Sequence, residues 1–254
     1  IKNTSEEHLD HISAAEVNAI MAKYDRESAT RIFSGKKALF IKILLISFTL
    51  FAVAINTFIR LNAQVHRATF IALILFLAYL LYPAKKNAPK DTNCIPWYDI
   101  LLAFTSSISF LYMALHYKQL VSQAGSYTQI DVTIAIVAIL LLMEACRRVV
   151  GLPILIVVSC FIAYAYFGGY IPGYFGHRGF TIQRIATHLY FTTEGVFGTP
   201  LAVCSTFIFL FILFGAFLER TGIGQFFIDI ANSIAGKATG GPAKVAVIAS
   251  ALQG

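Results

Sequence analysis

Long apolar runs separated by short polar segments make up most of the chain after residue 37. A helix needs about 20 apolar residues to cross a hydrocarbon core of about 30 Å, and several of the runs approach that length. The pattern therefore predicts an all-α integral membrane protein with about six transmembrane helices. The predicted spans are residues 38–59, 68–82, 97–117, 130–151, 152–170 and 196–218.

The second predicted span is the shortest, because Pro83 stops it. At 1.5 Å per residue, residues 68–82 would cover only about 22 Å of the bilayer. We therefore expect local thinning of the bilayer, or snorkelling by Arg67, to make up the difference.

Two other segments carry apolar residues at helical spacing but are too short and too polar on one side to span. Residues 182–190 predict a helix that lies in the membrane interface. Residues 222–236 predict a second interfacial helix, an arm whose polar face contains Asp229 and Asn232. The apolar face of this interfacial arm consists of Ile223, Phe226, Phe227, Ile230, Ala231 and Ile234.

Glycines follow the arm. Gly236 is suited to end its helix, and Gly240 and Gly241 would let the next element move, so we predict that these three glycines form a hinge. Pro242 suits the first turn of a new helix. The apolar, small-residue segment 242–254 is expected to be the first limb of a re-entrant hairpin, although an ordinary membrane span stays open as an alternative.

The composition supports lipid as the surrounding solvent. Hydrophobic residues make up 57% of the chain and charged residues 13%, about half the charged fraction of soluble domains. A net charge of +7 could indicate a nucleic-acid partner in a soluble protein, but most of the 20 Lys and Arg lie between the apolar runs. We interpret them as topogenic charges that keep the N-terminus inside, with residues 1–37 as a cytoplasmic arm, and we expect no nucleic-acid partner.

The polar side chains show no pattern typical of catalysis. Glu144 and Arg148 lie four residues apart and are expected to form an ion pair at the interface. His177, His188 and Glu194 lack the spacing of a metal site or an acid–base pair. We therefore expect no catalytic residues, no metal site and no enzymatic activity.

Five strings of residues carry a resemblance to a known family. They are KYDRESATRIFSG (23–35), PWYDILLAF (96–104), EACRRVVG (144–151), LYFTTEGVFGTPL (189–201) and the whole segment 209–254. Through these strings the chain resembles the fused permeases of TRAP transporters, in particular those that work with TAXI-type binding proteins. The resemblance covers nearly the whole chain from about Lys23.

The resemblance implies a division of the chain and a function. Residues 38–151 would be a four-helix scaffold like the small membrane subunit, and residues 152–254 would begin the large, transporting subunit. The expected function is sodium-coupled import of organic acids in the bacterial inner membrane, by an elevator-like movement. A TAXI-type extracytoplasmic binding protein would deliver the organic acid, and sodium would be the coupling ion, with no other cofactor.

The resemblance also implies where the solute site lies. A Gly/Ser-rich hairpin that binds sodium and substrate is expected to continue after Gly254, so that Ser250 and Gly254 are the only candidates in this chain. Free backbone groups at the ends of broken helices can bind a carboxylate and sodium there. A multi-pass channel, or a scaffold subunit without its own solute site, stays open as an alternative, and a membrane enzyme is a third class.

Overall fold

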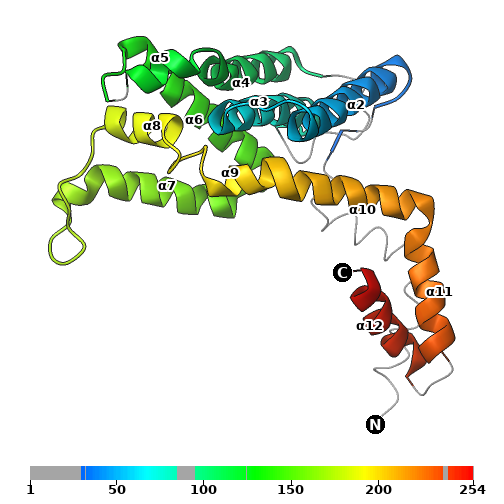
Figure 1. The fold of residues 1–254 in the computed structure, drawn as a ribbon. Helices are drawn as coiled ribbons and strands as arrows, with labels where there is room; N and C mark the ends of the chain where they lie inside the picture. Colours follow the sequence, from blue (N-terminus) through cyan, green and yellow to red (C-terminus); the bar gives the residue numbers. More distant parts are fainter. Residues whose placement is uncertain (1–29, 32, 85–94, 124, 237–239, 254) are drawn as a thin grey trace, which may run out of the picture. The chain divides into compact units, whose positions relative to one another are not determined.

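The computed structural model describes residues 30–31, 33–84, 95–123, 125–236 and 240–253, so most of the predicted N-terminal arm lies outside the described residues (Figure 1). The chain forms two compact units, Ile1–Ala202 and Val203–Gly254. Every regular element among the described residues is helical, which confirms the predicted all-α fold. Six helices are long and apolar enough to cross a membrane, as predicted.

The first unit contains seven complete α-helices and one 3₁₀ turn, Gly168–Tyr170, within the residues described. These helices are α2 (Lys36–Thr57), α3 (Ala63–Leu81), α4 (Trp97–Leu115), α5 (Tyr117–Ser122), α6 (Gln129–Val149), α7 (Leu152–Phe167) and α8 (Ile182–Phe191). α8 matches the predicted interfacial segment closely. The fourth and fifth spans follow each other with almost no loop, as predicted, because Gly151 adopts a φ of 108° and Pro153 occupies the first turn of α7.

The second predicted span was placed too late in the sequence. α3 begins at Ala63 and has 19 residues, enough for about 28 Å at 1.5 Å per residue. The polar residues Gln64, His66 and Arg67, which lie before the predicted start of the span, occupy its first turns. No thinning of the bilayer is therefore needed to explain a short span at this position.

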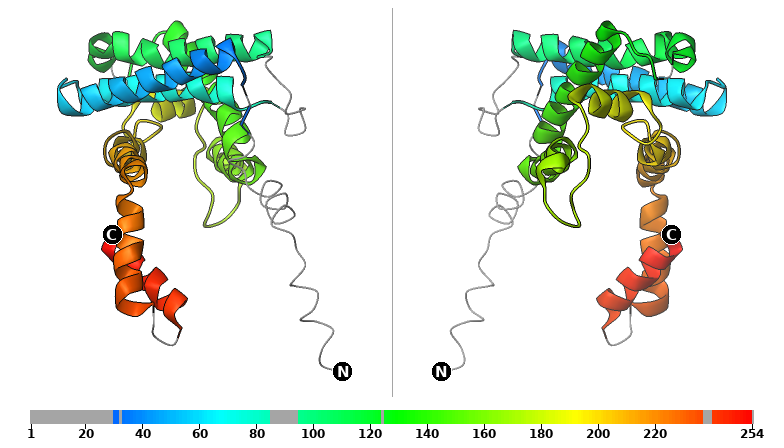
Figure 2. Two further views of the ribbon diagram at one scale, coloured as in Figure 1. Left: turned by 90° about the vertical axis from the view of Figure 1, so that its right-hand side faces the viewer. Right: turned by 90° about the vertical axis from the view of Figure 1, so that its left-hand side faces the viewer.

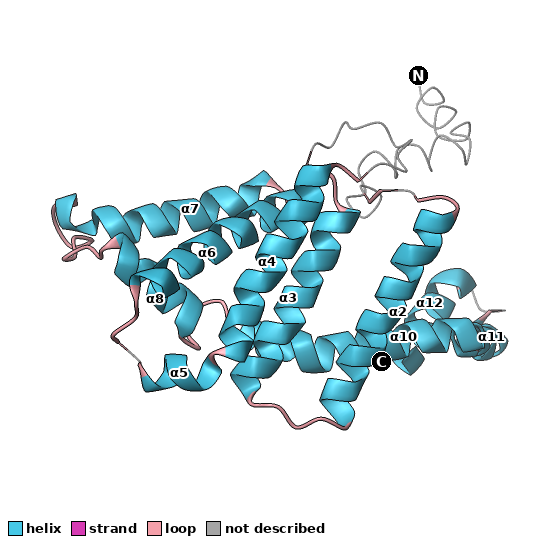
Figure 3. Ribbon diagram, turned by 90° about the horizontal axis from the view of Figure 1, so that it is seen from above, coloured by secondary structure: helices cyan, strands magenta, loops and turns pink. Residues whose placement is uncertain are grey.

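The core of the first unit lies where α3 packs along α4, and Figure 3 shows the two helices side by side. Tyr79, Phe110 and Met113 are among its largest buried side chains. Ser106 and Ser109 are also buried, and their hydroxyls donate to the carbonyls of Ala103 and Thr105 within the same helix. These serines therefore serve close helix packing, as small polar residues do in membrane helices.

The second unit continues the last span. α9 (Thr199–Val203), a π-helical turn (Cys204–Ile208) and α10 (Phe209–Thr221) make up this span, of which the part from Val203 belongs to the second unit. Gly222, in the left-handed conformation with a φ of 76°, ends α10. α11 (Ile223–Ala235) and α12 (Gly241–Gln253) then run antiparallel to each other (Figures 1 and 2).

Candidate functional site: a buried charge cluster and a glycine-flanked hairpin

The most strongly connected polar group in the first unit is a carboxylate held between two arginines. Asp99 lies in the first turn of α4, and its side chain is fully buried. Its Oδ1 accepts a hydrogen bond of 2.7 Å from Nη1 of Arg148 at the end of α6, and its Oδ2 accepts one from Nη2 of Arg31. The two guanidinium groups are only 2% and 5% exposed, so the three charges share one desolvated site.

A second carboxylate extends this group on α6. Glu144 accepts hydrogen bonds of 2.7 Å from Nε of Arg147 and 2.8 Å from Nε of Arg148. This confirms the predicted ion pair between Glu144 and Arg148. Arg148 thus pairs with both carboxylates, and its guanidinium also lies 4.8 Å from the centroid of the Tyr79 ring.

The cluster joins four parts of the chain at one end of the helices. The backbone N–H of Arg31 donates to Leu81 O at 2.9 Å, and its side chain donates to Leu80 O at 3.1 Å. Tyr79 donates to Leu141 O at 2.6 Å. The segment before α2 is thereby fixed to the end of α3, the start of α4 and the end of α6.

The geometry makes this cluster a clamp and leaves no room for a solute. Both oxygens of Asp99 are already bonded to arginines, and the carboxylate has no exposed surface. Three guanidinium groups face two carboxylates, so the cluster keeps one excess positive charge. Removing a partner from such a buried group leaves an uncompensated charge, which is strongly destabilising.

Aromatic side chains fix the segment around α8 to the other helices. Tyr190 is buried and donates to Ser109 O, and its ring lies 5.6 Å from that of Phe110. Phe197 is also fully buried, and its carbonyl accepts a hydrogen bond of 2.6 Å from Arg67. Burial raises the pKa of the Tyr190 hydroxyl, which therefore stays protonated and keeps donating.

The turn after α8 depends on a close backbone approach at Gly195. The N–H of Val196 donates to Leu189 O at 2.8 Å, which closes the turn. A Cβ atom at Gly195 would lie 2.1 Å from that same carbonyl oxygen, so no other residue fits without moving the backbone. The string LYFTTEGVFGTPL therefore forms a tight, aromatic-anchored connection.

Comparison with protein families found a match for the C-terminal part of the chain. Residues 137–254 match the family model described as Tripartite ATP-independent periplasmic transporter, DctM component. This segment is therefore similar to the DctM component of such transporters. Comparison with curated proteins and comparison with solved structures gave no match.

The DctM segment runs from within α6 to the end of the chain. It contains the tight turn at Gly195, the carboxylate Glu144 with its arginines, and the hairpin of α11 and α12. The predicted boundary between a small-subunit-like and a large-subunit-like part, at 151/152, stays a prediction. The boundary between the two compact units, at Ala202, is a property of packing and does not test it.

The predicted hinge glycines lie at the tip of the DctM hairpin. Gly240 has a φ of 75°, a conformation that favours glycine, with open space around its Cβ position. A Cβ at Gly241 would lie 2.4 Å from Gly236 O, and one at Gly236 would lie 2.2 Å from Oδ1 of Asn232. Gly236 and Gly241 thus have no room for a Cβ, whereas Gly240 only has a backbone conformation that favours glycine, and the role of the three as a hinge stays a prediction.

The two helices of this hairpin pack through small residues. Among their described residues, the buried ones are Ala231, Ala235, Gly241 and Ala249. On α11, Phe226 and Ile234 are 59% and 69% exposed, while Ile223, Phe227 and Ile230 are half-buried. The predicted apolar face is therefore divided: one edge turns toward the packed side of the hairpin and the other stays open.

The candidate solute-site residues are at the end of α12. Ser250 is exposed on this helix, and Gly254 lies outside the described residues. Among the residues that the structure describes, no group of three or more His, Cys, Asp or Glu could hold a metal ion. The solute site itself thus stays a prediction.

Sequence reasoning found one pair of the charge cluster and missed its centre. Asp99 and Arg31 were not recognised as partners, although each lies in one of the strings that carry the family resemblance. Three such strings, 23–35, 96–104 and 144–151, supply all the charged residues of the cluster. One feature of the sequence could have identified the centre of the cluster: Asp99 lies in the first turn of an apolar span, and a carboxylate at such a position needs a partner of opposite charge.

Proposed function

We propose that this chain is part of the permease of a sodium-coupled TRAP transporter that imports organic acids delivered by a TAXI-type binding protein. The observation that carries the proposal is the DctM segment, which ends in a helical hairpin with small residues between its helices. The family description names a tripartite transporter, which fits a permease that works with a separate binding protein.

In this proposal, α2 to α6 act as a fixed scaffold fused to the transporting part. The charge cluster supports a rigid role, because it joins the ends of three helices through desolvated ion pairs. Its excess positive charge supports a cytoplasmic position for that end, in agreement with the positive-inside rule. In this proposal the protein lies in a bacterial inner membrane, with its N-terminus in the cytoplasm.

The hairpin of α11 and α12 would begin the moving part. Small residues let helices lie close together without interlocking side chains, which suits an element that shifts in an elevator-like cycle. The chain around Ser250 and Gly254 would lead into the site for sodium and the organic acid. Backbone carbonyls and helix N-termini of broken helices would bind the ion and the carboxylate there.

A reconstituted transport assay tests this function. Proteoliposomes that contain the permease with this chain, an added TAXI-type binding protein and its radiolabelled organic acid receive an inward sodium gradient. We expect uptake that disappears when potassium replaces sodium or when the binding protein is left out. Flux that needs neither sodium nor the binding protein would instead indicate a channel. If the chain transports nothing even though its partner subunit is active, it would be a scaffold.

The orientation is tested separately by labelling single cysteines in intact cells with a membrane-impermeant thiol reagent. In a background without the four native cysteines, Lys118→Cys is expected to react from outside, whereas Glu219→Cys should react only after the cells are opened. The reverse pattern would contradict a cytoplasmic N-terminus.

A further inference from the structure

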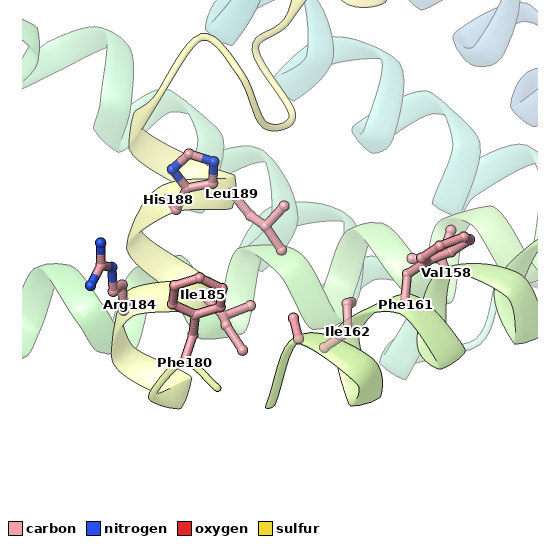
Figure 4. A pocket seen from close by; sticks show the side chains of 9 residues that line it. Val158, Phe161, Ile162, Phe180, Arg184, Ile185, His188 and Leu189 are labelled. Carbon is pink, nitrogen blue, oxygen red and sulfur yellow. The ribbon is translucent and has the colours of Figure 1, made fainter. Parts of the chain in front are cut away.

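An apolar groove of about 490 Å³ lies between α7 and α8 in the first unit (Figure 4). Val158, Phe161 and Ile162 line it from α7, and Ile185 and Leu189 line it from α8. The volume is in the range of sites that enclose small ligands. The groove is therefore large enough to bind an apolar chain.

The groove belongs to a part of the protein that fits a membrane. α7 lies in one of the six candidate spans, and among its described residues none is buried. Ile156, on the side of α7 opposite the groove, and Phe161, which lines it, are 58% and 69% exposed. Such a surface is stable against lipid chains, so the groove opens toward acyl chains.

Two basic side chains stand at the rim of this groove. Arg184 and His188 lie one turn apart on the same side of α8, as Figure 4 shows. The guanidinium carbon of Arg184 lies 5.2 Å from the centroid of the Phe180 ring, which positions the charge. Nε2 of His188 lies 3.7 Å from Oε2 of Glu194, whereas Arg184 has no carboxylate partner among the described residues.

A second apolar groove of about 370 Å³ adjoins the first. The two share Ile162, Ile185 and Leu189, and the second groove continues to Leu140 and Met143 of α6. The shared residues thus form a ridge with one apolar groove on each flank. Two chains that leave a single head group could occupy the two flanks.

We propose that this site binds one diacyl phospholipid, with an acyl chain in each groove and the phosphate at Arg184. The positive charge at the rim favours a phospholipid over other apolar ligands. The guanidinium of Arg184, beside an apolar groove, complements a phosphate attached to hydrocarbon chains. Arginine binds phosphate through two parallel N–H groups, and basic residues between membrane helices bind lipid head groups. His188 lines the same rim, but its Nε2 faces the Glu194 carboxylate, so Arg184 is the residue that would bind the phosphate.

A photoreactive phospholipid tests the proposal on the unmodified chain. The chain is reconstituted in bilayers that contain a phosphatidylglycerol with a diazirine in one acyl chain, irradiated and digested, and the labelled residues are identified by mass spectrometry. We expect label at Val158, Phe161 and Ile162 to exceed label at Ile156, on the opposite side of α7, several-fold. Equal labelling of the two sides of α7 would mean ordinary surrounding lipid, and unlabelled groove residues would mean that protein fills the groove; either result overturns the proposal.

Two matched pairs of variants test the groove and the charge separately. Val158→Trp fills the groove and should remove most of its label, whereas Ile156→Trp on the opposite side of α7 should not. Arg184→Gln should reduce phosphatidylglycerol retained on the purified protein about fivefold. Arg178→Gln removes a nearby exposed arginine that does not line the groove, and it should leave retention unchanged. Equal effects within either pair would contradict a specific phospholipid site.

Discussion

The four-helix part of the first unit and the hairpin of the second unit are both helical and apolar, but different side chains hold them together. In α3, α4 and α6 the buried positions include large side chains such as Tyr79 and Phe110, together with the paired charges around Asp99. In α11 and α12 the buried residues described are all Ala or Gly. Large interlocking side chains fix one arrangement, whereas small residues only allow close approach.

This difference indicates which part can move. A desolvated ion pair tolerates little displacement, because separating its charges without water is very costly. A contact between small side chains changes little in energy when the helices shift along each other. The comparison therefore predicts that single substitutions in the clamp affect stability, while those in the hairpin affect transport. Four experiments test it.

The largest effect is expected for Asp99→Asn. The substitution leaves Arg31 and Arg148 buried without their shared counter-charge, which should destabilise the protein by about 3–5 kcal/mol. Thermal unfolding of the purified protein, followed by the amount of monodisperse protein after heating, measures the change. The matched control is Asp229→Asn, which removes an exposed carboxylate on α11 and should change stability little. A similar melting temperature for wild type and Asp99→Asn would show that water reaches the cluster.

A second comparison uses two glycines with opposite surroundings. Gly195→Ala would place a Cβ 2.1 Å from Leu189 O and should destabilise the first unit by about 1–3 kcal/mol. Gly215→Ala in α10 meets nothing within 4 Å and should be neutral or stabilising by up to about 1 kcal/mol. The same unfolding assay measures both variants. Equal stability of the two would mean that the turn after α8 is not tight in solution.

The hinge prediction needs a variant that keeps the turn. Gly241→Ala would clash with Gly236 O and should reduce the yield of folded permease, so it does not isolate movement. Gly240→Asn keeps a residue that tolerates a φ of 75° and meets open space. If Gly240 is a hinge, this variant should express normally and transport several-fold more slowly in the sodium-driven assay. A normal rate would leave Gly240 with a role in the turn alone.

The smallest effect concerns the depth of the interfacial arm. In a background with Trp97→Phe, which removes the one native tryptophan, Phe226→Trp and Ser233→Trp place a reporter on the apolar and polar faces of α11. Brominated acyl chains should quench the tryptophan at 226 more than the one at 233, because only the apolar face enters the acyl boundary. Equal quenching would contradict an interfacial position of the arm.

Much of the fold could be predicted, because a membrane helix is specified by the hydrophobicity of residues that are neighbours in the sequence. The apolar runs gave six spans, and the periodicity of 182–190 and 222–236 gave α8 and α11 with nearly correct ends. The start of α3 was the main error, because Gln64, His66 and Arg67 interrupt the apolar pattern before residue 68. Arg67 can be part of a helix there because its side chain bonds to Phe197 O.

The candidate sites were less predictable, because they depend on distant residues. Glu144 and Arg148 could be paired from their spacing of four, a rule of local helix geometry. Asp99 could not be assigned to Arg148 and Arg31, which lie 49 and 68 residues away from it along the chain. The groove between α7 and α8 could not be predicted from the sequence either. The residues that line its walls are apolar, like the lipid-facing residues between them, so the sequence pattern does not distinguish the two sets.

The sequence by itself determined that this protein is helical, lies in a membrane and contains a glycine-flanked amphipathic segment, because hydrocarbon thickness and helix period act on neighbouring residues. The tertiary structure alone decided which charges share a buried site, which glycines have no room for a Cβ, and where a basic rim meets an apolar groove. These features depend on the distances between helices. A packed interior or a close backbone contact changes with shifts of a fraction of an ångström, which no local pattern specifies.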